Sequence, residues 1–160
     1  MTDPTEPHQD VAGCIYRVHA EVLRDTERAA VLISINVTDR EEGRRDNHRC
    51  PDGAVILPEN AGHWIGERRA AFLGGPDLIL EVLSEADETY LKFPFYEARG
   101  VREILIVDSE SRRPELWRRE ASGFRAVAPP LRSLVTGLVY AQVAGAVEIR
   151  DPASGKVWRV

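Results

Sequence analysis

Two carboxylates and a lysine are the residues of this sequence best suited to act together in chemistry. Asp52 follows a proline at the start of one apolar run, and Glu81 lies inside a second apolar run. An acid inside an apolar strand is costly unless it is paired or bound to a metal. If the two runs form neighbouring strands, both acids can face a common point. Oxygen ligands of this kind suit Mg²⁺, with Mn²⁺ as an alternative.

Two more residues extend this hypothesis. Asp77 lies four residues before Glu81, on the same face of the expected strand, and could be a third metal ligand. Lys92 follows the strand, where a helix that folds back could aim its ammonium at the same point. A metal can polarise a phosphoryl oxygen and activate water, and a lysine can offset developing negative charge. The pattern indicates phosphodiester hydrolysis, with Asp52, Glu81 and Lys92 as candidate catalytic residues.

Simpler explanations of the same residues stay open. An acid at the end of a strand often serves as a turn residue or as an ion-pair partner. A structural pair with Lys92 or Arg102 would also satisfy Glu81. His19, on the expected first helix, could line the site or lie on the helix surface.

The segment that must position these groups is a strand, a helix and a second strand. Residues 77–83 and 104–107 are apolar runs rich in Leu, Ile and Val. The apolar spacing between them is helical until Gly100, a residue type that commonly ends helices. Pro94 requires that the helix begin close to it or be kinked there. The segment therefore predicts a parallel pair of strands with a right-handed crossover.

Elements on either side complete an α/β pattern. Residues 11–23 predict an amphipathic helix, residues 29–37 a strand near the centre of the sheet, and residues 52–57 a further strand. Residues 38–47 predict an exposed loop, and residues 58–75 a loop with one short helix. Two hairpins are expected after the second strand of the parallel pair, at 114–118 with 124–127 and at 146–150 with 156–160.

Length and composition set the limits of the interpretation. A chain of 160 residues is expected to form a single domain, here residues 11–160, after a disordered tail of residues 1–10. With 43% hydrophobic and 29% charged residues, the composition is that of a soluble globular protein. No apolar run is long enough for a membrane span, and we expect a cytoplasmic protein.

The charge distribution bears on nucleic-acid binding. A net charge of −5 argues against tight binding of nucleic acid by charge alone. Arg44, Arg45 and Arg49 nevertheless precede Asp52 and could contact phosphates that flank the site. A homodimer would double such contacts, so we expect a dimer that acts on DNA.

Several motifs together resemble one known family. They are PDLILEVLS at 76–84, Asp87, Lys92, Tyr96, Gly100 with Val101, ILIVD at 104–108 and CPDGAVI at 50–56. This combination resembles the Uma2 family of endonucleases, within the restriction-endonuclease-like PD-(D/E)XK superfamily. The resemblance covers about residues 49–118. It implies a restriction-endonuclease-like core with a mixed central sheet flanked by helices, followed by additional β-hairpins.

The resemblance also implies which residues form the site. It implies that Asp52 and Glu81 hold the metal. The superfamily usually has its lysine two residues after the glutamate, where this chain has Leu83. In Uma2 proteins the lysine is in the next helix, a place that Lys92 occupies. The family usually has proline at the position of Glu85, so this chain carries an added acid there.

Three functions follow from these observations. The first is a Mg²⁺-dependent endonuclease that hydrolyses DNA. The second is a catalytically inactive binding or assembly module on the same fold. Leu83, at the usual position of the lysine, and the added acid Glu85 favour this function. The third is a metal-dependent hydrolase of small phosphate compounds, which would tolerate the acidic net charge better.

Overall fold

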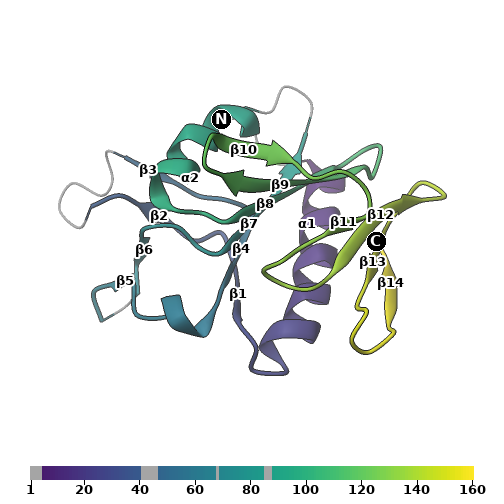
Figure 1. The fold of residues 1–160 in the computed structure, drawn as a ribbon, viewed down its shortest axis with the longest axis horizontal. Coiled ribbons are helices and arrows are strands. Elements are labelled where there is room, and N and C mark those ends of the chain that lie inside the picture. Colours follow the sequence, from purple (N-terminus) through teal and green to yellow (C-terminus); the bar gives the residue numbers. More distant parts are fainter. Residues whose placement is uncertain (1–4, 41–46, 68, 85–87) are drawn as a thin grey trace.

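A mixed six-stranded sheet forms the centre of the protein. The computed structural model describes residues 5–40, 47–67, 69–84 and 88–160. The strand order is β1-β4-β7-β8-β9-β10, with β7 parallel to β8 and every other neighbouring pair antiparallel. The strands are β1 Ala30–Ile33, β4 Gly53–Ile56, β7 Leu78–Leu83, β8 Glu103–Asp108, β9 Pro114–Glu120 and β10 Gly123–Ala126. The structure thus confirms the expected mixed sheet and its parallel pair (Figure 1).

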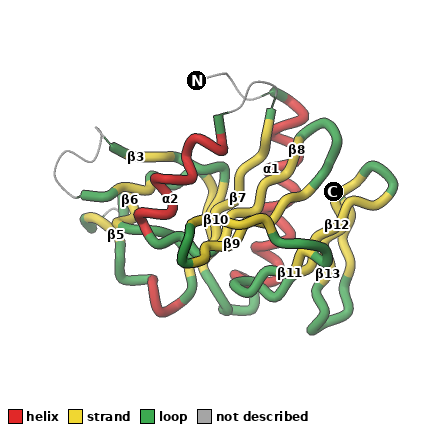
Figure 2. The backbone as a smooth tube through the Cα atoms, turned by 45° about the horizontal axis from the view of Figure 1, so that its top comes forward, coloured by secondary structure: helices red, strands yellow, loops and turns green. Residues whose placement is uncertain are grey.

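Helices cover both faces of this sheet. Helix α1 (Glu6–His19), extended by one π-helical turn at Ala20–Arg24, packs with Leu78, Leu80 and Val82 of β7 in one core cluster. Helix α2 (Phe93–Arg99) follows a 3₁₀ turn, η3 (Thr89–Lys92), and packs with Ile79 in the other cluster. Figure 2 shows the two helices on opposite sides of the strands. The alternation that the sequence predicts for β7 is confirmed.

Two smaller sheets flank the central one. The C-terminal sheet has the order β11-β12-β13-β14, and the other has the order β3-β2-β6-β5. Their strands are β2 Val37–Thr38, β3 His48–Arg49, β5 Trp64–Ile65, β6 Ala71–Leu73, β11 Leu131–Arg132, β12 Val139–Val143, β13 Ala146–Arg150 and β14 Val157–Arg159. Both expected hairpins are present, as β9 with β10 and β13 with β14. Strands β5 and β6 lie where the sequence predicts a loop and one short helix, because runs of two or three residues show no periodicity.

The strand predicted at residues 29–37 is not central. It is split into β1, at the edge of the main sheet, and β2, in the small sheet. The chain turns between them at Ser34, whose φ is 49°. Only Val31 of β1 is buried, and Ile33 is 58% exposed. The apolar, β-branched composition predicts a strand correctly but carries no information about which strands pair with it.

The structure also corrects the prediction of a disordered tail at residues 1–10. Helix α1 begins at Glu6, so residues 6–10 are helical, while residues 1–4 lie outside the described part. Pro7 occupies the first turn, where its missing N–H has no intrahelical partner to lose. His8 is buried against the rest of the protein. The helix therefore extends one turn further than its apolar residues indicate.

Helix α2 resolves the question raised by Pro94. The proline lies in the first turn of α2, so the helix begins late and is not kinked. Gly100 ends the helix in the left-handed conformation, with φ 84°. No helix of the described residues is both long and apolar enough to cross a membrane.

A buried histidine attaches the C-terminal sheet to α1. His19 is fully buried, so it neither lines the site nor lies on the helix surface. Its Nδ1–H donates to the carbonyl of Ile15 at 2.8 Å, and its Nε2 accepts from the hydroxyl of Tyr140 on β12, also at 2.8 Å. Burial lowers the pKa of His19 to about 4, against a smaller opposing effect of the bond to Ile15.

This lowered pKa predicts a loss of stability in acid. A histidine with a folded-state pKa below its unfolded value stabilises the fold fully above pH 6.5, and that contribution is lost as the pH falls towards 4. The loss reaches about 3 kcal/mol. Urea unfolding of the wild type and of His19→Gln between pH 7 and pH 4 measures it. We expect the wild type to lose more stability than the variant by about this amount, and equal losses would contradict the assignment.

Candidate active site

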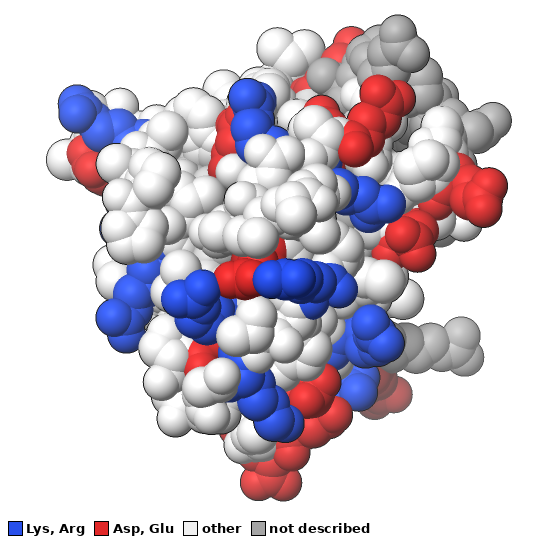
Figure 3. Space-filling model, turned by 90° about the vertical axis from the view of Figure 1, so that its right-hand side faces the viewer, with Lys and Arg blue, Asp and Glu red and all other residues white. Residues whose placement is uncertain are grey.

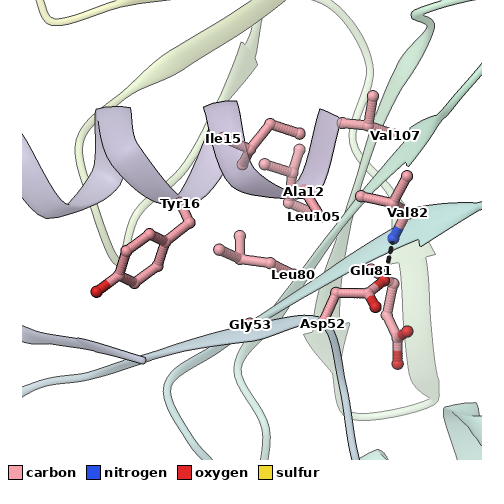
Figure 4. A pocket seen from close by; sticks show the side chains of 10 residues that line it. All are labelled: Ala12, Ile15, Tyr16, Asp52, Gly53, Leu80, Glu81, Val82, Leu105 and Val107. Atoms are coloured by element: carbon pink, nitrogen blue, oxygen red, sulfur yellow. Dashed lines mark hydrogen bonds between the residues drawn. The ribbon is translucent and has the colours of Figure 1, made fainter. Parts of the chain in front are cut away.

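Asp52 and Glu81 lie across from one another on neighbouring strands. Strands β4 and β7 are antiparallel, with Gly53 opposite Leu80, so Asp52, immediately before β4, lies opposite Glu81. The Oδ2 atom of Asp52 accepts a hydrogen bond from the backbone N–H of Val82 at 2.8 Å. Figure 4 shows the two acidic side chains next to each other with this bond drawn. The expected adjacency of the two strands is present in the structure.

Glu81 receives two side-chain donors from the segment that covers its face of the sheet. Its Oε2 is 2.9 Å from the Nζ of Lys92, and its Oε1 accepts from the hydroxyl of Tyr96 at 2.7 Å. Lys92 is the last residue of η3 and Tyr96 lies in α2. Residues four apart lie on the same side of a helical segment, so one segment delivers both groups to one carboxylate.

Burial controls the electrostatics of this cluster. Glu81 is 3% exposed, and desolvation raises the pKa of its carboxyl to about 7, although Lys92 and Tyr96 favour the ionised form. The negative charge of Asp52 raises this pKa further. Burial and the neighbouring Glu81 also raise the pKa of Tyr96, so its phenol remains a hydrogen-bond donor. The site concentrates negative charge that a cation would stabilise.

A cavity of about 10 Å³ lies beside the two acids. Its volume corresponds to about one water molecule. Its walls come from α1 and from strands β4, β7 and β8, and apart from the two acids they are mostly apolar (Figure 4). The lining residues are Ala12, Ile15, Tyr16, Asp52, Gly53, Leu80, Glu81, Val82, Leu105 and Val107.

Asp77 is not brought to this cluster. It lies just before β7, four residues from Glu81, which corresponds to roughly 13 Å along a strand. Its Oδ2 accepts from the N–H of Leu57 and its Oδ1 from the side chain of Asn60, both at 2.8 Å. Arg102 lies 3.3 Å from Oδ1. Asp77 therefore lies at the end of β7 away from the site, where it holds the turn after β4.

Of the three arginines predicted to contact phosphates, only Arg49 lies in the described residues. Arg44 and Arg45 lie outside them. The guanidinium of Arg49, on β3, lies 5.0 Å from the ring centroid of Phe95, which precedes Tyr96 in α2. The positive charge of Arg49 lowers the pKa of Tyr96, against the larger effects that raise it. Arg49 is therefore close to the candidate site.

Tyr96 and His8 were not among the site residues predicted from the sequence. The signal for Tyr96 was its spacing of four residues from Lys92. His8 contacts Asp52, with 3.3 Å between its Nε2 and the Oδ2 of the carboxylate. It was missed because the segment around it was interpreted as a tail.

The donor set fits a hard divalent cation. Asp52 and Glu81 supply carboxylate oxygens, and Mg²⁺ typically takes one or two carboxylates and keeps several waters. The Oδ1 atom of Asp52 has no hydrogen-bond partner within the described residues. Across those residues, no three His, Cys, Asp or Glu side chains form a ready metal cluster. The two acids are thus suited to an ion whose shell is completed by water, not to one enclosed by protein.

Comparison with known proteins places this site in a family. The model of the Uma2 family, described as "putative restriction endonuclease", matches residues 1–140. The chain belongs to the Uma2 family. This confirms the resemblance that the motifs at 50–56, 76–84 and 104–108 carry. A comparison with curated proteins finds no match for this Uma2 protein.

A solved structure supports the fold assignment. The Uma2 protein is similar to a crystal structure described as a "putative nuclease belonging to DUF820" from Anabaena variabilis. The two share 16% sequence identity with a TM-score of 0.64, over 89% of this chain and 74% of the other. Likeness at this identity concerns the fold. The protein therefore has a nuclease-like fold, and family and fold together support a nuclease.

The partners of Asp77 predict a structural role. Replacing it with Asn leaves two partly buried donors competing for one amide oxygen, and leaves Arg102 with the more distant Glu59, at 3.8 Å, as its ion-pair partner. We expect Asp77→Asn to lower the free energy of unfolding by about 2 kcal/mol. Any metal affinity of the folded protein should stay unchanged. Urea unfolding and calorimetric Mn²⁺ titration check the two parts. A variant of normal stability with weakened Mn²⁺ binding would return Asp77 to the metal site.

Proposed function

We propose that this Uma2 protein is a metal-dependent endonuclease that hydrolyses phosphodiester bonds of DNA. The observation that carries the proposal is the contact of 2.9 Å between the Nζ of Lys92 and the Oε2 of Glu81, with Asp52 on the adjacent strand. This cluster unites two acids and one ammonium at the end of a central strand. Membership of a family described as "putative restriction endonuclease" supports the same chemistry.

Asp52 and Glu81 would hold the cation, Mg²⁺ or alternatively Mn²⁺. When bound, such a cation polarises a phosphodiester oxygen and makes a nearby water a better nucleophile. The Oδ1 atom of Asp52, to which none of the described residues donates a hydrogen bond, is a candidate ligand atom. Each oxygen of Glu81 has one hydrogen-bond partner and keeps a second lone pair for a ligand. Asp77 is not part of the proposed site.

Lys92 and Tyr96 have different proposed roles beside Glu81. Tyr96 is fully buried, and its hydroxyl holds Glu81 in one orientation. The side chain of Lys92 is 26% exposed, so its ammonium can meet a substrate as well as Glu81. There it would offset negative charge that develops on the phosphate during hydrolysis. The small volume beside the acids leaves room for about one water.

The proposed DNA contacts use positive charge on two parts of the surface. Arg49, on β3, lies against Phe95 of α2, next to the site residue Tyr96. In addition, residues 111–160 contain nine Lys and Arg against four Asp and Glu, although the whole chain has a net charge of −5. Figure 3 shows Lys and Arg side chains distributed over the side of the molecule that carries the C-terminal sheet. A homodimer, also proposed, would bring two such surfaces and two sites to one duplex.

A second candidate function is an inactive binding module on the same fold. The observation in its favour is that both oxygens of Glu81 already have partners, Lys92 and Tyr96. A carboxylate whose hydrogen bonds are all made to neighbouring side chains of the protein can be purely structural. DNA binding without cleavage would support this second candidate.

The chain offers a matched test of Lys92, because it contains only two lysines, Lys92 and Lys156. Lys156 is 63% exposed and pairs with Glu21 on the surface. With plasmid DNA and Mg²⁺ or Mn²⁺, we expect the wild type to nick or cut. Glu81→Gln and Lys92→Met should each lower the cleavage rate by at least about 100-fold, since each removes a charge at the reacting centre. Lys156→Met should cleave like the wild type.

Three other results would contradict the proposal in distinct ways. Cleavage that survives Lys92→Met would remove the lysine from the mechanism. A wild type that binds DNA but cuts nothing with either metal would favour the inactive module. Hydrolysis of nucleotides without cleavage of DNA would indicate a hydrolase of small phosphate compounds.

A further inference from the structure

A histidine continues the buried stripe of helix α1 up to the candidate site. His8, Val11, Ile15 and Val18 follow one another at helical intervals, and none is more than 8% exposed. The three apolar residues belong to the core cluster on that face of the sheet. His8 lies beyond the end of this cluster and contacts Asp52, at 3.3 Å from its Nε2 to Oδ2. A polar group this deeply buried is costly unless it has a partner, and Asp52 is that partner.

Two nitrogen atoms from separate elements lie close to the same oxygen of Asp52. Oδ2 accepts from the backbone N–H of Val82 at 2.8 Å and lies 3.3 Å from His8. The backbone donor belongs to β7 and the imidazole to α1, so two separate elements hold the same atom. Among the described residues, Oδ1 has no such partner. The carboxylate is therefore oriented through Oδ2, and Oδ1 is available to a ligand.

The surroundings of the imidazole define which nitrogen carries the proton. The Nδ1 atom of His8 is buried and has no hydrogen-bond partner among the described residues. A proton on Nδ1 alone would turn the lone pair of Nε2 towards the carboxylate oxygen, which is repulsive. A proton on Nε2 provides the donor that Oδ2 requires. The contact with Oδ2 thus favours a proton on Nε2.

We propose that His8 is a positioning residue of the candidate site, which orients Asp52 through Nε2–H so that Oδ1 can bind a divalent cation. This inference rests on the proposed function and extends it to the first turn of α1. Hydrogen bonds that orient a metal ligand commonly contribute about 10-fold to 100-fold in metal affinity. The N-terminal helix is then part of the site as well as part of the core.

Calorimetric titration with Mn²⁺ tests this role, with three variants of the full chain. His8→Phe keeps the ring and removes the donor, whereas His8→Gln keeps an N–H near the position of Nε2. His63→Ala removes an exposed histidine and serves as the control. We expect His8→Phe to bind Mn²⁺ at least about tenfold more weakly than the wild type. His8→Gln should retain most of the affinity, and the control all of it.

Cleavage assays separate positioning from a general loss of structure. His8→Phe should require a higher Mg²⁺ concentration for half-maximal cleavage, with a kcat close to that of the wild type once Mg²⁺ is saturating. A lower kcat with an unchanged Mg²⁺ requirement would overturn the inference. Equal Mn²⁺ affinities of wild type and His8→Phe would also overturn it, yet leave the proposed function intact. A wild type that binds no Mn²⁺ would end both proposals.

A measurement on the wild type covers the case in which His8→Phe does not fold. Long-range ¹H–¹⁵N correlation of the histidine rings reports which nitrogen carries the proton. We expect the proton of His8 on Nε2 in the metal-free protein and a change in its ring signals when Mg²⁺ is added. A proton on Nδ1, or ring signals that are indifferent to Mg²⁺ while the metal binds, would overturn the inference.

Discussion

The structure depends on keeping one acidic side chain inside the central sheet. Glu81 is 3% exposed in a strand whose other residues are apolar, and burial alone would favour its neutral form. Lys92 and Tyr96 offset that cost from a single helical segment. Because the segment is the crossover between β7 and β8, the acid and its partners are placed by one parallel strand–helix–strand unit.

Three buried acids in and beside β7 and β8 each accept hydrogen bonds from another part of the chain. Asp77 accepts from a backbone N–H of the turn after β4. Glu103 accepts from the backbone of Leu134, from Ser133 and from Arg118, and so ties the C-terminal segment to the central sheet. Glu81 accepts from Lys92 and Tyr96 of the crossover, and within the described part of the chain no donor reaches the Oδ1 atom of its neighbour Asp52. Each of these acids thus connects the central sheet to a different part of the chain.

The site also joins elements that are far apart in the chain. Asp52 comes from the start of β4, Glu81 from β7, Lys92 and Tyr96 from the crossover, and His8 from the first turn of α1. Strand pairing places the two acids, and helix packing on opposite faces brings the other groups to them. The fold of this Uma2 protein therefore positions the candidate chemistry through its central unit and surrounds it on both faces of the sheet.

Local patterns in the sequence determined the parallel unit, the alternation along β7, the end of α2 at Gly100 and the candidate residues Asp52, Glu81 and Lys92. These features follow from spacing within one element, or from motifs that resemble a family. Only the tertiary structure decided that β1 lies at an edge, that Asp77 holds a turn away from Glu81, and that His8 meets Asp52. Each of these depends on which distant segments pack together. A periodicity of two or 3.6 residues records which face of an element is buried, but not which element buries it.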